Sequence, residues 1–399
     1  MKSPCRTSVR QGSQTVSWNN LAAPRRTINV SSTNPRRFPG RLRPVGPAGG
    51  CTVGAWSLDG RWVYLTVQTS HGTHLWRQRF PDGTPEQITS GPTEEDGLAI
   101  APDGRSIITS VGTEQSSLWL HDGSGERQIS LEGYASHPVF SPDMRRLYFL
   151  TSRSGSRLAG NLWVAELDGS RNEVVLPGVA VSAGFHGGFS LSPDGKRAVF
   201  TVREADGKPR LWLAALDRRS APRPIPSAEG SEPHFASSGE IYFRVTEGAS
   251  SYVYRIREDG SGRVKVLADP IGELTGMSPD GRWASVWAPA GQGESTTDHW
   301  LFPLAGGPPI PVPGAVSWSH DGRHVLVTRG GQVHGVRTVV VPVPSGKAFP
   351  DGLRAETDES ALPGAVVISS PWVVIGSSPG VYVYRKVAVQ RNLFRIPLQ

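Results

Sequence analysis

One feature constrains the fold of this 399-residue chain more than any other: a short run rich in β-forming residues occurs eight times at nearly constant spacing. The runs cover residues 62–67, 106–111, 146–151, 197–202, 240–245, 283–288, 324–329 and 372–377. Their first residues lie 40 to 51 positions apart. This period suits a repeated unit of four short strands and is too long for a repeat built from two short helices.

A turn of the Asp-Gly kind precedes most of these runs. It is complete at residues 59–60, 103–104, 194–195, 280–281 and 321–322, whereas Met144 replaces the glycine once and only Ser238-Gly239 remains in another copy. Aspartate can bond the backbone two residues on, and glycine adopts the positive φ that closes a hairpin. Each turn therefore predicts a hairpin between an innermost strand and the second strand of one sheet.

Two further strands complete each predicted sheet. Third strands begin with an apolar-aromatic pair such as Leu75-Trp76 or Leu211-Trp212, and we interpret Trp76, Trp119, Trp163 and Trp212 as core packing between sheets. Fourth strands are short and are followed by Gly or Pro, which protects a sheet edge from pairing with another chain.

These signals predict an all-β fold, a β-propeller of four-stranded antiparallel blades. We expect eight blades, with residues 41–45 as the fourth strand of the C-terminal blade, so that the two chain ends close the ring. Seven blades is the alternative if residues 365–399 pack elsewhere. The predicted domains are a basic, disordered leader or linker over residues 1–38 and a single propeller over residues 39–399.

The turns and inner strands resemble the TolB-type (WD40-like) propeller repeat, over roughly residues 41–399. The residues that carry the resemblance are 56–62 (WSLDGRW), 140–143 (FSPD) and 191–196 (LSPDGK). The resemblance implies a fold and binding of a protein or ligand, and it implies no reaction. Similar repeats cap prolyl-oligopeptidase-like peptidases and follow kinase domains in bacterial sensors, so the chain is alternatively the separated propeller or sensor part of such a protein.

Charge is concentrated at the start of the chain. Residues 1–45 carry nine Lys and Arg and no Asp or Glu, so the net charge of +7 leaves −2 for the remainder. A nearly neutral propeller argues against nucleic acid as a partner. No apolar segment follows Arg6 and Arg10, so we recognise no signal peptide. The chain as written is expected to be cytoplasmic, or periplasmic or extracellular if its N-terminus is truncated.

Enzyme chemistry has one motif to consider, residues 376–380 (GSSPG), which match a nucleophile elbow. No His, Asp or Glu follows Ser378, so we interpret these residues as a hairpin turn. The histidine pairs His71 with His74 and His320 with His324 lack a metal-ligand pattern, and we interpret them as solvated turn residues.

A binding site is expected at the mouth of the central channel, in the loops that enter the innermost strands. The candidate ligand-binding residues there are Glu95, Asp96, His137, His186, His234 and Glu273. The three histidines precede inner strands of consecutive blades and could share a ligand, an anion or a metal. The alternative is that each packs on its neighbouring blade and bonds a backbone carbonyl.

We therefore predict a non-catalytic, monomeric propeller that acts as a scaffold or sensor for a protein partner or small ligand. No catalytic residue, metal ligand or cofactor is assigned. The alternative is a propeller enzyme of the hydrolase or lactonase type.

Overall fold

The computed structural model describes residues 8–11, 14–18, 28–32, 43–47, 50–69, 72–131, 133–152, 159–184, 187–288, 298–331, 335–354 and 357–398. Over these residues the protein is all β apart from one short 3-10 helix, η1 (Glu359–Ala361). No helix in these ranges is long and apolar enough to cross a membrane. The predicted all-β class is confirmed, and so are the four-stranded antiparallel sheets.

The chain divides into two compact units. The first unit comprises Met1–Gln115, Ser152–Arg157 and Val387–Gln399, and the second comprises Ser116–Thr151 and Leu158–Lys386. This division differs from the predicted single domain over residues 39–399, because residues 39–115 and 387–399 belong to the first unit. Within residues 1–38, predicted as a leader or linker, the structure describes three strands.

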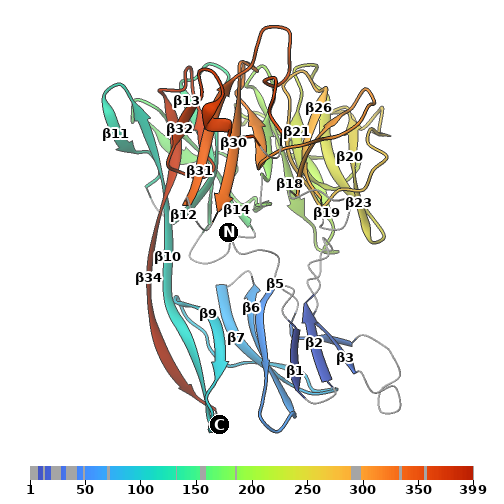
Figure 1. Ribbon diagram of the computed structural model, residues 1–399, viewed down its shortest axis with the longest axis vertical. Coiled ribbons are helices and arrows are strands. Elements are labelled where there is room, and N and C mark those ends of the chain that lie inside the picture. Colours follow the sequence, from blue (N-terminus) through green and yellow to red (C-terminus); the bar gives the residue numbers. More distant parts are fainter. Residues whose placement is uncertain are drawn as a thin grey trace. The chain divides into compact units, whose positions relative to one another are not determined.

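The first unit holds two four-stranded antiparallel sheets and part of a ten-stranded sheet, which is described third below (Figure 1). The strands of the first sheet are β1 (Ser8–Gln11), β2 (Gln14–Trp18), β3 (Ile28–Ser32) and β4 (Arg43–Val45). The second contains β5 (Gly50–Trp56), β6 (Trp62–Thr69), β7 (Gly72–Arg79) and β8 (Pro85–Gln87). In the third, β9 (Glu94–Ile100) pairs antiparallel with the first part of β10 (Ser106–Asp122).

Two long neighbouring strands, β10 and β34 (Tyr382–Pro397), contribute residues to both units (Figure 1). The sequence predicts a hairpin between residues 106–111 and the Leu118-Trp119 pair, but β10 runs through both without a turn. The reason is local, because the intervening residues 112–117 (GTEQSS) contain no Asp-Gly, Asn-Gly or Pro that would reverse the chain. The last run is also shifted, since its strand β33 (Val374–Ile375) is the first strand of its hairpin.

The second unit contains consecutive sets of four strands (Figure 1). The sets are β12 (Tyr134–Phe140), β13 (Arg146–Ser152), β14 (Ala159–Glu166) and β15 (Asn172–Val174); β17 (Phe189–Leu191), β18 (Arg197–Arg203), β19 (Pro209–Ala215) and β20 (Arg223–Glu229); β21 (Ser231–Phe235), β22 (Ile241–Glu247), β23 (Ser250–Ile256) and β24 (Val264–Lys265); β25 (Glu273–Met277), β26 (Trp283–Trp287), β27 (His299–Pro303) and β28 (Ile310–Pro311); and β29 (Ala315–Trp318), β30 (His324–Gly331), β31 (Gly335–Pro342) and β32 (Val366–Ile368). The first set, β12–β15, is part of a ten-stranded sheet in which β12 pairs parallel with β10 at Tyr134 and Ser116, and the other sets are separate sheets. The short strand β16 (Val181–Ser182) pairs with β14.

A further set of strands in this unit combines distant segments of the chain. β33 pairs with the start of β34, β34 neighbours β10, and the end of β10 pairs with β11 (Gly125–Gln128). Val374 lies opposite Val383, and residues 376–381 form the predicted hairpin turn, closed by the Gly376 N–H bond to the Val381 carbonyl. The GSSPG motif is therefore a turn in this structure.

Apolar side chains point alternately to the two faces of each sheet, because successive strand residues face opposite ways. On β13, Leu147 and Phe149 pack toward β10 and β34, whereas Tyr148 and Leu150 pack toward the β17–β20 sheet. Similar buried clusters join β17–β20 to β21–β24, β21–β24 to β25–β28, and β25–β28 to β29–β32. Another joins β30 and β31 to β33 and β34. Face-to-face packing of consecutive four-stranded sheets is the arrangement of a propeller.

The predicted tryptophans take part in this packing. Trp119, Trp163 and Trp212 each contact a buried cluster of the second unit, and Trp76 contacts one in the first.

The hairpin turns are built around a repeated serine. Ser192 Oγ donates to Asp194 Oδ1 at 2.5 Å and accepts from the Arg197 N–H at 3.0 Å, while Asp194 accepts from the Lys196 N–H at 3.1 Å. Turns beginning at Ser57, Ser141, Ser278 and Ser319 repeat this pattern. The glycine that follows Asp has φ near 70°, and Met144 adopts φ 55° in its place. The predicted role of the Asp-Gly turn is confirmed.

The prediction that residues 41–45 pair with the C-terminal hairpin is wrong. β4 pairs antiparallel with β3, with Ile28 opposite Val45 and Val30 opposite Arg43. β34 instead neighbours β10 and β33. The C-terminal strand β34 lies beside β10, because β10 continues past the point where the sequence predicts a turn.

Candidate functional site

The predicted channel-mouth residues fall into two groups. Glu95 and Asp96 lie on β9 in the first unit, opposite Val111 and Ser110 of β10. His137 on β12, His234 on β21 and Glu273 on β25 lie in the second unit, each on the first strand of a different sheet. His186 lies outside the described residues. The sequence predicts that these histidines precede inner strands, whereas His137 and His234 lie within β12 and β21, and a shared ligand remains a hypothesis.

His137 adopts an unusual backbone. Its φ is 53°, in the left-handed region that non-glycine residues rarely occupy, and its Nδ1 lies 3.0 Å from Ser136 Oγ. His234 follows a bulge in β21, where the register shifts between Ser231 and His234. Such bulges re-aim side chains at the ends of strands.

Glu232, inside that bulge, was not among the predicted residues. It has φ 56°, its side chain is buried, and its Oε2 accepts from Arg244 Nε at 2.9 Å. The same oxygen accepts from the backbone N–H of Leu274 on β25 at 2.8 Å. Arg244 Nη1 also donates to the Gly272 carbonyl at 3.1 Å. One carboxylate therefore joins the β21–β24 sheet to the β25–β28 sheet.

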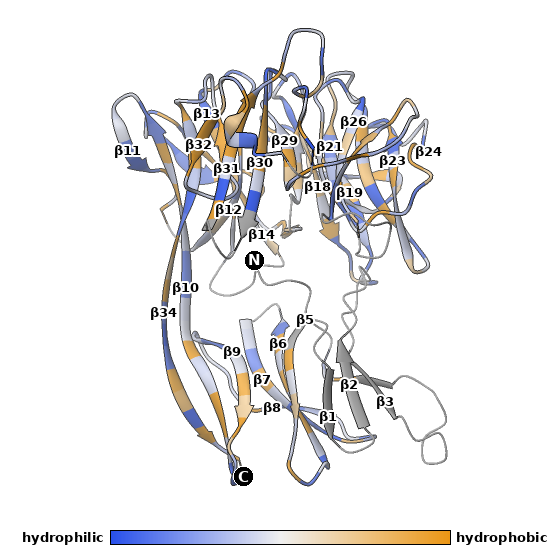
Figure 2. Ribbon diagram, viewed as in Figure 1, coloured by the Kyte–Doolittle hydropathy of each residue, from blue (hydrophilic) through white to orange (hydrophobic). Residues whose placement is uncertain are grey.

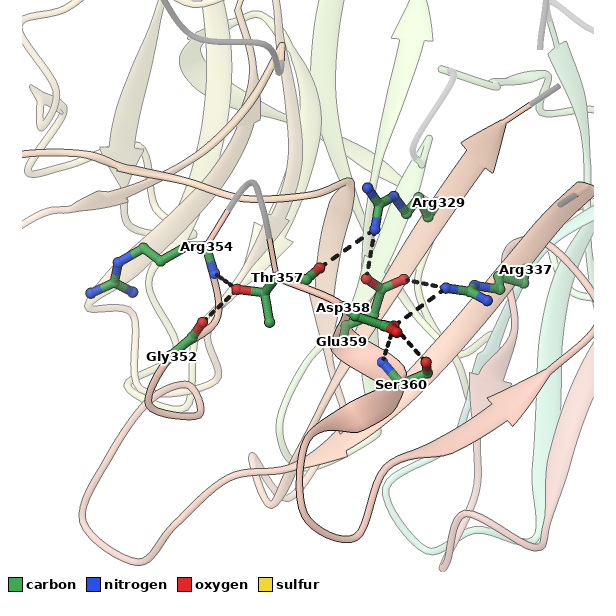
Figure 3. A network of polar contacts seen from close by, with 8 residues as sticks. All are labelled: Arg329, Arg337, Gly352, Arg354, Thr357, Asp358, Glu359 and Ser360. Atoms are coloured by element: carbon green, nitrogen blue, oxygen red, sulfur yellow. Dashed lines mark hydrogen bonds and ion pairs between the residues drawn. The ribbon is translucent and has the colours of Figure 1, made fainter. Parts of the chain in front are cut away.

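Glu359 is the centre of a second buried ion-pair network, shown in Figure 3. Its side chain is 0% exposed, and its two oxygens lie 2.9 Å from Arg329 Nη1 and 3.4 Å from Arg337 Nη2. Asp358 caps η1 by accepting from the Ser360 N–H, and it lies 3.8 Å from Arg337. This network fixes the loop between β31 and β32 on the two middle strands of the sheet, β30 and β31, which carry the arginines.

In the first unit, Glu95 forms a buried pair with His74. His74 Nδ1 lies 3.0 Å from Glu95 Oε2, and both side chains are at most 4% exposed. Thr89 Oγ1 donates to the same oxygen at 2.7 Å and accepts from the Leu75 N–H at 2.9 Å. The interpretation of His74 as a solvated turn residue is wrong, because β7 extends over this position and β9 covers it. His71 lies outside the described residues.

Hydroxyl groups make comparable links between consecutive sheets of the second unit. Ser190 Oγ accepts from the Phe235 N–H at 3.1 Å, and Ser285 Oγ accepts from the Val316 N–H at 3.2 Å. Thr338 Oγ1 donates to the Ser370 carbonyl at 2.9 Å, and Ser116 Oγ donates to the Ala135 carbonyl at 2.7 Å. These side chains satisfy backbone groups in the following sheet for Ser190 and Ser285, in the segment after β32 for Thr338, and on the paired strand β12 for Ser116, which stiffens the framework.

A hollow of about 230 Å³ lies elsewhere in the second unit, away from the predicted residues. Arg146, Arg171 and Arg218 line it together with Glu166, Glu173 and Asp217. Three arginines therefore face three carboxylates, so the formal charges balance, and Arg171 and Arg218 both pair with Glu173. Over the described ranges, no three His, Cys, Asp or Glu side chains gather closely enough to hold a metal ion.

Sequence reasoning missed Glu232, Glu359 and His74. Glu232 had a usable signal, because it directly precedes the Pro233-His234 pair that marks the start of an inner strand. Glu359 had none, since its two arginines lie 30 and 22 residues earlier.

Comparison with known proteins finds solved structures that are similar to the chain at low identity. No family model matches it, and no curated protein does either. TolB from Acinetobacter baumannii is 12% identical over 86% of this chain and 81% of its own, with a TM-score of 0.42. A putative TolB from Agrobacterium tumefaciens is 16% identical over 69% of this chain and 99% of its own, with a TM-score of 0.47. An oligogalacturonate lyase from Vibrio parahaemolyticus is 13% identical over 82% and 87%, with a TM-score of 0.38. TolB proteins are thus among the structures this chain is similar to, and no activity is carried over from any of them.

Proposed function

We propose that the second unit is a closed propeller of six blades and that the chain is a non-catalytic scaffold for a protein partner or small ligand. The buried clusters support the ring, because they join the sheets in cyclic order from β12–β15 through β29–β32 to β33, β34, β10 and β11, and back to β12 and β13. The blade that closes this ring would combine residues 116–128 with residues 374–386. Six blades are proposed in place of eight because residues 62–67 and 106–111 belong to the first unit.

The observation that carries the scaffold is the use of polar side chains on the first and second strands of the sheets. Glu232 bonds the backbone of the next sheet, as do Ser190 and Ser285 in their own sheets. Side chains that are hydrogen-bonded to the backbone of the next sheet hold neighbouring blades rigidly against each other. A rigid frame that presents loops is the usual basis of recognition by a propeller.

The test is partner capture with the purified full-length chain, combined with turnover assays on an ester and a lactone probe. We expect a partner or small molecule to bind in a defined ratio, and His137→Ala or His234→Ala to weaken that binding. Asp259→Asn, in the exposed turn between β23 and β24, is the matched control and should have no effect. Hydrolysis of either probe by the parent, lost in a histidine variant, would instead favour the propeller-enzyme alternative.

A further inference from the structure

Within the ten-stranded sheet, the portion made of β9, the first part of β10 and the last part of β34 has three strands, whereas the separate sheets have four. Elsewhere in the described ranges, the third strand of a sheet is followed by a short fourth one, such as β8 beside β7, β15 beside β14, β24 beside β23 or β32 beside β31. In this portion the third strand is β34 from Val387 onward, and its described partner is β10. The place of a fourth strand beside β34 is open over the described residues.

The open edge carries exposed apolar side chains. Val387, Val389, Leu393 and Phe394 are 42%, 56%, 77% and 50% exposed. Figure 2 shows the corresponding orange stretches along the part of β34 that leads to the C-terminus, interrupted by blue. A long strand with an unpaired edge and apolar side chains is a template for another strand, and natural proteins usually cover or charge such an edge.

This strand is held firmly in spite of its exposure. Arg395 bonds Ser106 Oγ at 2.7 Å and Asp103 Oδ2 at 2.8 Å, and the Leu398 N–H bonds the Arg105 carbonyl at 2.8 Å. Ile396 and Leu398 pack on the buried cluster of Tyr64, Leu75 and Ile107. The edge is therefore formed in advance, which reduces the entropy lost when a partner binds.

We propose that this edge binds an extended segment of another protein, which adds beside β34 as the fourth strand of the sheet. The inference rests on the proposed scaffold function and names a partner-binding surface for it. Backbone hydrogen bonds would give affinity and the apolar side chains would select alternating apolar residues, as in other cases of strand addition.

The charges indicate an acidic segment. Residues 387–397 contain Arg391 and Arg395 and no Asp or Glu. Arg391 is 13% exposed and pairs with Glu94, so the accessible charge is that of Arg395, which remains 63% exposed although it contacts Asp103. Arg105, at the same end of the strand pair, is also exposed. A second copy of β34 would bring like charges together, whereas a carboxylate of a partner strand would meet an accessible guanidinium.

The probe is a fluorescent ten-residue peptide in which valine alternates with threonine and glutamate. Its control is the same peptide methylated on alternate backbone nitrogens, which removes the donors that a strand needs. With the full-length chain we expect binding of the first peptide and at least tenfold weaker binding of the methylated one. Hydrogen exchange at residues 387–395 should slow only with the first peptide.

Two variants locate the site. Leu393→Glu places a negative charge beside the acidic peptide and should weaken binding at least tenfold. Val264→Glu, at an exposed valine of the edge strand β24, should leave binding unchanged. Equal binding of both peptides, no binding of either, or a dimer of the chain that Leu393→Glu dissociates would overturn the proposal. Capture of a partner that depends on His137 and persists in Leu393→Glu would uphold the scaffold function while locating recognition away from this edge.

Discussion

The Glu232 carboxylate accepts a hydrogen bond from the Leu274 backbone N–H at 2.8 Å, although the two residues lie in different sheets. Glu232 reaches this position with φ 56°, a conformation that costs a non-glycine residue about 1 kcal/mol or more. The bulge in β21 is therefore maintained by the contacts it allows, with Arg244 on one side and the neighbouring sheet on the other.

Removal of this carboxylate should destabilise the fold. Glu232→Ala leaves the largely buried Arg244 without its partner and the Leu274 N–H without its acceptor. We expect the free energy of unfolding to fall by about 3 kcal/mol, the usual cost of breaking a buried ion pair. Urea denaturation measures the change. Glu229→Ala, which removes an exposed pair with Lys208, should change it by less than about 1 kcal/mol.

A side chain at Gly112 should separate two strands of the first unit. A Cβ there would lie 1.9 Å from the Gln390 carbonyl oxygen and 2.7 Å from Arg391 Cα, so backbone would have to move. We expect Gly112→Ala to accelerate hydrogen exchange at residues 387–397 and to lower the free energy of unfolding by more than about 2 kcal/mol. Gly123→Ala meets no atom within 4 Å and serves as the control. Unchanged exchange in Gly112→Ala would contradict the pairing of β10 with β34.

Two hairpin glycines separate two contributions to the free energy of unfolding: the strain of a positive φ in a residue with a Cβ, and the steric contact that this Cβ makes. Gly60 has φ 70° with no atom within 4 Å of a Cβ, whereas a Cβ at Gly195 would lie 3.0 Å from Pro142 Cδ at φ 66°. Gly60→Ala should therefore lower the unfolding free energy by about 1 kcal/mol through φ alone. Gly195→Ala should cost more, and thermal unfolding of the two variants gives the comparison.

The turn aspartates predict a loss of stability in acid. The Ser192 hydroxyl, followed by the Lys196 N–H, lowers the pKa of Asp194 below its ordinary value of 3.8, and the Ser57 and Ser141 hydroxyls lower the pKa of Asp59 and of Asp143 in the same way. A carboxyl whose pKa is lower in the folded state stabilises the fold above its unfolded pKa, and this stability is lost as the pH falls through the folded pKa. The free energy of unfolding should therefore decline below about pH 4.

Asp194→Asn tests this dependence. The variant should be less stable than the parent near neutral pH, and the difference between them should shrink as the pH falls below about 4, because the parent carboxyl becomes neutral. Denaturant unfolding at a series of pH values measures it. A difference that stays constant with pH would mean that the Asp194 charge has no part in the turn.

Local signals predicted much of the fold and little of the site. The Ser-x-Asp-Gly turn is recognisable because all of its bonds lie within six residues, as at Ser192 and Arg197. His74 and Glu95 were assigned separately, one as solvated and one as a candidate for ligand binding, because nothing in either segment shows that β9 covers β7. Arg329, Arg337 and Glu359 likewise meet only after β30, β31 and the following loop have packed.

The sequence alone determined the all-β class, the four-strand period, the turn chemistry and the alternation of core side chains, since each depends on residues close together in the chain. The tertiary structure decided where those strands pair: β10 runs on through a predicted turn, β34 lies beside it, β4 joins β3, and Glu232 bonds the N–H of Leu274, which lies 42 residues later in another sheet. Edges of different strands offer the same N–H and C=O groups, so the choice among partners depends on the packing of the whole set of sheets.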